Sequence, residues 1–237
     1  ITVRATYTNP NGGEKAYDDA QIQLVDKIQR VVDLVVSTAD GKSAYFEGST
    51  VQLVVKQKFD NNSLSNAINS GVTWSVNNTA FGSINASNLA TLAAVTGDKQ
   101  FIVTPTFDGV TASAPLTINI KDIVPVSVAV SSSKGTTIKR GETTELTATI
   151  TYNNNTTGVA TGSQHKVSWS NDNTAAGTGI TVSGKYAFTA SATDVDLSAN
   201  IKAITDVAQV EGSIKLDIDG YPLPTSITIN GLSEVNA

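Results

Sequence analysis

The chain alternates apolar and polar residues over much of its length. In residues 146–152 (LTATITY) an apolar side chain occupies every second position, and threonine occupies the positions between. Residues 126–130 and 214–218 alternate in the same way. A period of two predicts strands that bury one face against a core and expose the other to water. Only residues 89–95 (LATLAAV) form an apolar run in which a short helix could compete with a strand.

The sequence repeats itself at an interval of about 95 residues. Trp74 lies in VTWSVNNTA and Trp169 lies in VSWSNDNTA. Upstream of them, EGSTVQL and RGETTEL place Gly48 opposite Gly141 at nearly the same interval. The interval divides the chain into residues 29–122 and residues 123–219 as two whole units. Residues 1–28 are then the terminal hairpin of a preceding unit, and residues 220–237 begin a following unit or linker.

Short strands separated by tight turns in a unit of this length predict a two-sheet antiparallel sandwich. The turn residues are Asn, Asp and Gly, for example at positions 11–13, 40–41, 108–109 and 219–220. Val, Thr, Ser, Ala, Asn and Ile dominate the composition, and β-branched residues favour strands. The expected fold class is all-β, with tandem antiparallel β-sandwiches.

Three segments of the first whole unit resemble the bacterial immunoglobulin-like group 2 domain. They are GSTVQLVV, VTWSVNNTAFGSINASNLATLAAVTG and FIVTPTFDGVTASAPLTINI. The second unit keeps Gly141, Trp169 and the hairpin ITVSGKYAFTA but lacks the DGV turn. The resemblance implies tandem immunoglobulin-like domains of a bacterial cell-surface protein, as in invasin and intimin type adhesins, surface-layer proteins and some phage virion proteins.

Composition excludes several classes of function. The chain has no Cys, no Met and a single His, so a disulfide framework, a thiolate metal site and a multi-histidine metal site are excluded. A net charge of −5 and a pI near 4.8 argue against a nucleic-acid partner. No apolar run is long enough for a transmembrane segment. The first residue is Ile1 and no signal segment follows, so we expect an interior piece of a longer chain.

Residues capable of catalysis are scarce. His165 is the only imidazole, and general-base chemistry would require a nucleophile and a carboxylate beside it. We expect instead a solvent-facing histidine, and we expect no enzymatic activity. Trp74 and Trp169 are interpreted as core anchors, with a carbohydrate-stacking platform as the alternative. Five N-x-S/T triplets are either glycan acceptors or chance products of Asn-rich loops, and begin at Asn61, Asn77, Asn85, Asn154 and Asn155.

Acidic residues recur where one unit should end and the next begin. Asp26 and Asp122 lie 96 positions apart, and Asp217 and Asp219 fall near the equivalent point. A junction could gather such carboxylates around calcium, which takes several oxygen ligands, and the metal would stiffen the array. The alternative is that these residues solvate a linker and protect edge strands. No later Glu completes a calcium loop after Asp217 and Asp219.

Two classes of function follow from these observations. In the first, the chain is a non-enzymatic structural part of an extracellular, self-associating array of the surface-layer type. In the second, it is the stalk of an adhesin, or a phage virion protein. The expected partners are further copies or neighbouring domains of the same chain, with a host or cell-wall glycan bound through parts outside this sequence.

Overall fold

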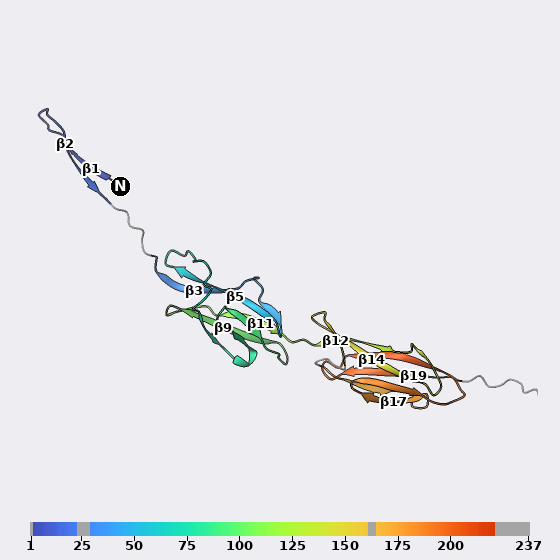
Figure 1. The fold of residues 1–237 in the computed structure, drawn as a ribbon. Helices are drawn as coiled ribbons and strands as arrows, with labels where there is room; N and C mark the ends of the chain where they lie inside the picture. Colours follow the sequence, from blue (N-terminus) through green and yellow to red (C-terminus); the bar gives the residue numbers. More distant parts are fainter. Residues whose placement is uncertain (1, 23–28, 161–164, 221–237) are drawn as a thin grey trace, which may run out of the picture. The chain divides into compact units, whose positions relative to one another are not determined.

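The computed structural model describes residues 2–22, 29–160 and 165–220 (Figure 1). It divides into two compact units, Ile1–Ile120 and Lys121–Ala237. Strands account for nearly all of the regular structure in the described residues, and one 3-10 turn (η1, Thr79–Phe81) accompanies them. The fold class expected from the alternating pattern is confirmed.

The second unit is a sandwich of two sheets. One sheet has the order β12-β14-β18-β17, formed by Pro125–Ser132, Thr143–Tyr152, Lys185–Ala190 and Gly177–Val182, and β15 (Thr157–Val159) also pairs with β14. The other has the order β13-β20-β19-β16, formed by Thr137–Lys139, Glu211–Asp219, Leu197–Thr205 and Val167–Asn171. These two orders are those of an immunoglobulin-like sandwich.

The first unit repeats this arrangement. One sheet has the order β3-β5-β8-β7, formed by Val31–Thr38, Thr50–Phe59, Leu89–Leu92 and Gly82–Ile84. The other has the order β10-β9-β11-β4, formed by Val110–Thr111, Lys99–Phe107, Leu116–Lys121 and Ala44–Phe46, and β6 (Thr73–Val76) pairs with β9. The run at residues 89–95, where a helix could have competed, begins with strand β8.

A separate hairpin precedes these sheets. Strands β1 (Thr2–Tyr7) and β2 (Ala16–Gln21) pair antiparallel, and every residue in them is exposed. This pairing agrees with the hairpin expected in residues 1–28, although the assignment of that hairpin to a preceding unit stays a prediction. The division between the compact units falls two residues before the boundary expected at residue 122.

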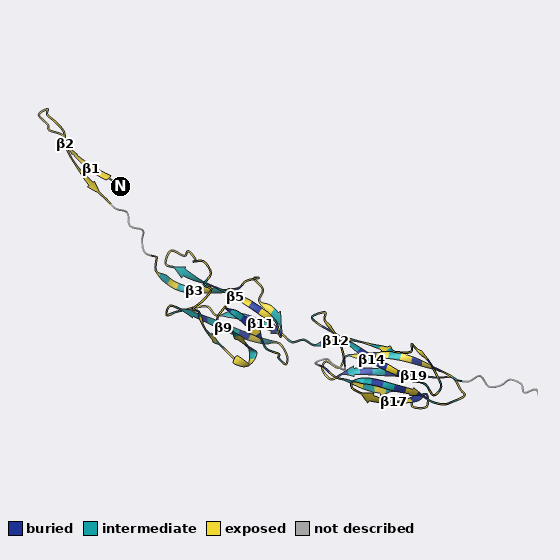
Figure 2. Cartoon of the chain, in the orientation of Figure 1, coloured by how far each residue is buried: buried dark blue, intermediate teal, exposed yellow. Residues whose placement is uncertain are grey.

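Each sandwich encloses an apolar core between its two sheets. In the second unit the core gathers residues from both sheets, including Leu146 and Phe188 from one and Ile201 and Leu216 from the other. In the first unit Leu53, Phe101 and Ile118 are buried in the same way. Figure 2 shows the resulting alternation of buried and exposed residues along the strands. The period of two in the sequence therefore reports burial directly.

The chain crosses the second unit from one end to the other. Pro125, at the start of β12, pairs with Tyr152 at the end of β14. Asp219, at the end of β20, pairs with Lys139, which a short turn joins to Thr143 at the start of β14. The start of β12 and the end of β20 therefore lie near opposite ends of β14, which are about 30 Å apart in a ten-residue strand.

The chain also crosses the first unit from one end to the other. Val31 pairs with Phe59 at the end of β5. Asn119, near the end of β11, donates its backbone N–H to Ser43 O, close to the segment that leads into Thr50 at the start of β5. Within each unit, the chain thus enters at one end and leaves at the other.

Candidate functional site

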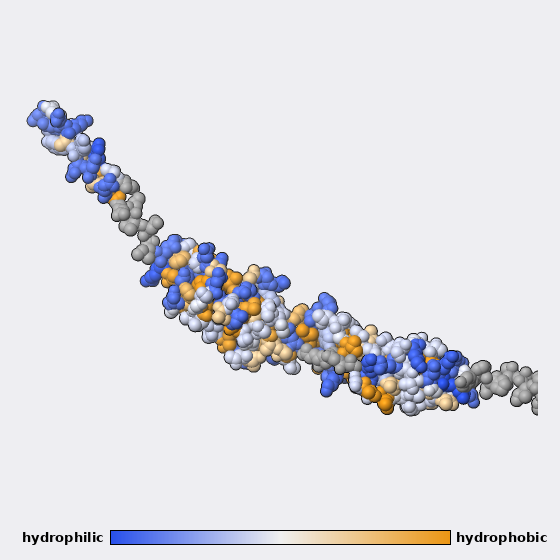
Figure 3. All heavy atoms as spheres, viewed as in Figure 1, coloured by the Kyte–Doolittle hydropathy of each residue, from blue (hydrophilic) through white to orange (hydrophobic). Residues whose placement is uncertain are grey.

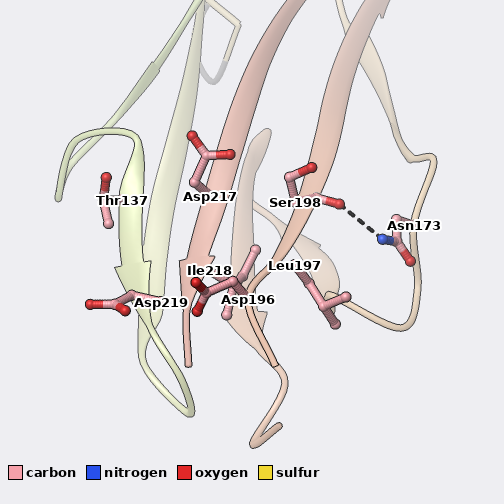
Figure 4. A pocket seen from close by; sticks show the side chains of 8 residues that line it. All are labelled: Thr137, Asn173, Asp196, Leu197, Ser198, Asp217, Ile218 and Asp219. Atoms are coloured by element: carbon pink, nitrogen blue, oxygen red, sulfur yellow. Dashed lines mark hydrogen bonds between the residues drawn. The ribbon is translucent and has the colours of Figure 1, made fainter. Parts of the chain in front are cut away.

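An acidic hollow lies at the end of the second unit where β20 finishes. It has a volume of about 640 Å³ and is lined by eight residues, Thr137, Asn173, Asp196, Leu197, Ser198, Asp217, Ile218 and Asp219 (Figure 4). Strand β20 supplies Asp217 and Asp219 on alternate positions, so their side chains share one face of the strand. Asp196 comes from the loop before β19. The Nδ2 of Asn173 donates to Ser198 O at 2.9 Å and holds the opposite wall.

Two of the three carboxylates of this hollow, those of Asp217 and Asp196, already have partners in the protein. Lys215 Nζ lies 2.7 Å from one oxygen of Asp217. Asp196 Oδ1 accepts the backbone N–H of Gly220 at 2.9 Å. The carboxyl groups of Asp217 and Asp219 point in different directions in Figure 4. Within the described residues, no three His, Asp or Glu side chains are grouped so that they could hold a metal ion. Calcium at this end therefore stays a prediction.

The remaining acidic candidates are not in this hollow. Asp122 belongs to the opposite end of the second unit, where its carbonyl oxygen accepts a hydrogen bond from Asn153 Nδ2 at 2.9 Å. Asp26 lies outside the described residues. The structure therefore brings together Asp217 and Asp219 and separates both from Asp122. Sequence reasoning missed Asp194 and Asp196, although the DVD spacing after Thr193 places two carboxylates on alternate positions.

Asp33 is an acidic residue that holds strands together. Its Oδ2 accepts the Ser113 hydroxyl at 2.6 Å, and its Oδ1 accepts the backbone N–H groups of Ser113 at 2.9 Å and Leu34 at 2.8 Å. These hydrogen bonds, led by the Ser113 hydroxyl, stabilise the carboxylate and lower the pKa of Asp33 below its ordinary value. The residue joins β3 to the segment that follows β10.

His165 was expected to face the solvent, and that expectation is wrong. The residue is 9% exposed and lies against Tyr152, with the two ring centroids 5.8 Å apart. Its Nε2 is 3.2 Å from Ile123 O, and its Nδ1 is 3.8 Å from Asp206 Oδ1. Burial follows because the imidazole packs at a tilt against Tyr152, which belongs to an apolar cluster of the second unit. The ring thereby joins the segment that enters the unit to the loop after β19.

Both tryptophans pack against the sandwich cores. Trp74 contacts the apolar clusters of the first unit, and its Nε1 donates to Asn88 Oδ1 at 3.1 Å. Trp169 lies on the Tyr186 ring, with centroids 5.5 Å apart and planes 18° apart, and its Nε1 donates to Gly184 O at 3.2 Å. Each indole thus combines apolar packing with a satisfied polar group. This placement favours the core anchor over the carbohydrate platform.

Three of the N-x-S/T triplets form local turns, and in one of them the side-chain oxygen of Asn85 accepts the backbone N–H of Ser87 at 2.9 Å. The side-chain oxygen of Asn61 accepts the backbone N–H and hydroxyl of Ser63, at 2.9 and 2.6 Å. Asn154 makes the same two bonds to Thr156, at 3.0 and 2.6 Å. Asn and Ser or Thr two residues apart are favoured in such turns, so turn chemistry accounts for these triplets.

Comparisons with known proteins add the following findings. No protein-family model matches the sequence, and no curated protein matches it. Among solved structures, the S-layer protein rSbsC is 16% identical with a TM-score of 0.42, over 82% of this chain and 29% of that one. The Escherichia coli adhesin FdeC is 15% identical with a TM-score of 0.33, over 92% of this chain and 82% of that one. Titin domains Z1Z2 are 13% identical with a TM-score of 0.38, over 84% of this chain and 98% of that one.

The chain spans less than a third of the length of the S-layer protein it matches. At these identities and TM-scores the likenesses carry no argument about function. The class of protein is therefore defined by its own topology, that of tandem immunoglobulin-like β-sandwiches. Among the helices that the described residues form, none has the length and apolar character needed to span a membrane.

Proposed function

We propose that this chain is a non-enzymatic structural segment of an extracellular surface protein, in which immunoglobulin-like units are joined in series in a surface-layer type array. The observation that carries the proposal is the path of the chain through each unit. Because the chain enters at one end and leaves at the other, tension applied to the chain passes lengthwise through every sandwich. A unit built in this way is suited to bearing load within a larger assembly.

The connection between the units supports the same role. Strand β11 ends at Lys121 and β12 begins at Pro125, so only three residues separate them. Asn153 holds this connection on the second unit, because its backbone N–H donates to Val124 O at 3.0 Å and its Oδ1 accepts the Val124 N–H at 3.2 Å. A connection anchored to a folded turn has less freedom than an open linker of equal length.

The last strand of the second unit is secured by a parallel pairing. Strand β13 runs parallel to β20, with Thr137, Ile138 and Lys139 opposite Asp217, Ile218 and Asp219. The bonds include Asp217 N to Thr136 O at 2.8 Å and Arg140 N to Asp219 O at 3.2 Å. Pulling on the two ends of the unit draws these strands lengthwise in opposite directions. Their hydrogen bonds then share the load and must break together.

Stretching the chain between its two ends in a single-molecule force experiment tests this proposal. Two separate unfolding events are expected, each releasing about 30 nm of chain, since about 95 residues extend by about 3.5 Å each. Unfolding under force depends on the unfolding rate, which the β13–β20 bonds should limit. A chain that extends without distinct unfolding events would contradict the load-bearing role.

The contribution of the parallel pairing is isolated by two variants of one residue. Arg140 precedes Gly141, which has φ of +72°, and Glu142 N donates to Lys139 O at 3.0 Å, so Arg140 holds the second position of a turn that accepts proline. Arg140→Pro removes the backbone donor to Asp219, whereas Arg140→Ala keeps it and removes the side-chain pair with Asp194. The unfolding force of the second unit should be lower in Arg140→Pro than in Arg140→Ala.

The alternative proposal is an adhesin stalk, which shares the path of the chain through each unit. A stalk requires no lateral association, whereas a surface array requires contacts between chains. Lateral association of the full chain in solution or on a support therefore discriminates between the two.

A further inference from the structure

Strand β17 is an open sheet edge in the second unit. It is the last strand of its sheet and pairs only with β18 among the described residues. Its sequence, GTGITV, has no charged residue and no proline, although these are common protections of an edge. Ile180 is 66% exposed and Val182 is 53% exposed. Figure 2 shows β17 largely exposed, and Figure 3 shows apolar side chains in its region.

Other sheet edges at comparable positions are closed or short. Strand β12, at the opposite edge of the same sheet, lies so close to β20 that a Cβ on Gly212 would overlap Val128 O. In the first unit the strand equivalent to β17 is β7, which has only three residues, of which Ser83 is exposed. The six-residue edge of β17 is thus a property of the second unit and does not follow from the repeat.

The turn between β17 and β18 determines which backbone groups of the edge are free. Ser183 and Gly184 form a two-residue turn with φ of +50° and +79°, and Val182 pairs with Lys185 across it. In such a hairpin the pair that closes the turn exchanges both hydrogen bonds, and bonded pairs then alternate. The N–H and C=O groups of Val182, Ile180 and Thr178 therefore point toward β18. Those of Thr181 and Gly179 point away from the sheet.

An independent contact agrees with this alternation. Gly177 O accepts a hydrogen bond from Asn171 Nδ2 at 2.9 Å, on the side away from β18. Gly177 and Gly179 also face the core, where a Cβ on either would overlap the ring of Phe188 or Tyr186. The aromatic rings therefore occupy the inner face beside these two glycines.

We propose that β17 pairs antiparallel with β17 of a second copy of this chain, about a two-fold axis at Ile180. In this register Gly179 of one copy faces Thr181 of the other, and the two pairs exchange four backbone hydrogen bonds. Ile180 meets Ile180 of the second copy on the outer face of the joined sheet. Thr178 meets Val182. Every free backbone group of Gly179 and Thr181 is then satisfied.

The absence of charge and the self-complementary pattern of free backbone groups identify a second copy as the occupant. A strand without charge can meet itself without repulsion, even though the whole chain carries a net charge of −5. The contact is isologous, so one patch serves both partners. A six-residue pairing buries less than the roughly 1,200 Å² of a stable interface, so the isolated contact is weak. Many copies in one array would make it effective through multivalency. The inference therefore rests on the proposed surface array and gives one of its lateral contacts.

Disulfide trapping tests the pairing in the full chain, which has no native cysteine. The opposed residues at position 180 form a non-hydrogen-bonded pair with Cα atoms about 4.5 Å apart, within the range for a disulfide. Mild oxidation of Ile180→Cys should give a covalent dimer at least tenfold faster than oxidation of Val126→Cys. Val126 is a matched control because it is 52% exposed and lies on β12, the closed edge of the same sheet.

The register is tested with two further variants. Two copies of Val182→Cys would place their cysteines about 14 Å apart, too far for a disulfide. A mixture of Val182→Cys and Thr178→Cys chains should form the mixed dimer, and each variant alone should form little dimer. Equal trapping of Val182→Cys alone and in the mixture would indicate random collision and overturn the pairing.

A charged substitution distinguishes this inference from the broader proposal. Ile180→Lys would place two like charges opposite each other and should reduce self-association of the full chain in sedimentation velocity. Its melting temperature should be unchanged because Ile180 is largely exposed. Undiminished association of the folded Ile180→Lys chain, or trapping of Ile180→Cys no faster than Val126→Cys, would overturn the β17 contact while leaving the array proposal standing. Absence of association in every variant, together with a chain that extends without unfolding events, would contradict both.

Discussion

Replacing Trp169 by alanine should destabilise the second unit and spare the first. The indole packs against two apolar clusters that extend along the second sandwich, and it stacks on Tyr186. Its N–H also donates to Gly184 O in the β17–β18 turn. Alanine would remove the stacking and the donor and would leave a cavity between the sheets.

The size of the effect follows from this burial. Truncation of a large buried aromatic residue costs about 3–5 kcal/mol. Trp169 is only partly buried, so we expect a loss near the lower end, about 3 kcal/mol. A domain of this size has a total stability of about 5–15 kcal/mol, and its melting temperature falls by about 4–8 °C for each kcal/mol lost. The melting temperature of the second unit should therefore fall by about 12–24 °C.

The two tryptophans make the assay specific, because each unit contains one. In Trp169→Ala the only remaining indole is Trp74, so tryptophan fluorescence reports the first unit alone. Circular dichroism and calorimetry report both units. We expect an unchanged fluorescence transition and a separate calorimetric transition at lower temperature. Trp169→Phe, which keeps an aromatic ring beside Tyr186, should show a smaller shift.

Two results would refute this reasoning. If the Trp74 fluorescence transition fell together with the calorimetric one, the units would not unfold independently. If neither transition moved, Trp169 would not be a core anchor, and its contacts with Tyr186 and Gly184 would contribute nothing measurable to stability.

Three further predictions concern ionisation, burial and metal binding. Because the pKa of Asp33 is lowered in the folded state, its hydrogen bonds to Ser113 stabilise the fold fully at pH values above the unfolded pKa of about 3.9. This stabilisation is lost as the pH falls through the folded pKa. The difference in melting temperature between the native chain and Asp33→Asn should therefore be largest near neutral pH and should shrink below about pH 4. Tyr152 has a buried hydroxyl without a hydrogen-bond partner in the described part of the chain, so Tyr152→Phe should leave thermal stability unchanged or raise it, and a fall of more than about 1 kcal/mol would contradict this. If calcium binds at the junctions, the small-angle scattering profiles of the native chain with calcium and with chelator should differ, and those of Asp122→Ala should not. Identical profiles for the native chain would contradict calcium binding and would support the alternative that Asp122 and Asp219 solvate a linker.

The sequence allowed the fold to be predicted because burial in a sandwich follows the same period as the chain. Leu146, Ala148 and Ile150 alternate with threonines in the sequence, and all three are buried in the structure. The tryptophan repeat predicted two similar units, and in the structure Trp74 lies on β6, which pairs with β9, while Trp169 lies on β16, which pairs with β19. The short apolar run at residues 89–95 was ambiguous because composition does not separate a buried strand from a helix over so few positions.

The polar contacts were harder to predict, because they depend on distant segments meeting. His165 is buried by Tyr152 and by the loop that contains Asp206. Both residues are distant from His165 in the sequence, so the residues around His165 did not indicate its burial. Asp33 is bonded to Ser113, which lies 80 positions later in the chain, and no local pattern in the sequence marks this pair. The open edge of β17 was also hidden, since the hairpin sequence does not show which strand will be last in its sheet.

The parallel pairing of β13 with β20 also has a consequence for biosynthesis. Thr137 must wait for Asp217, which is made 80 residues later, before the two strands can join. Partners so far apart in sequence close late and fold slowly. During synthesis the second unit therefore holds an unpaired β13 until β20, its final strand, has emerged.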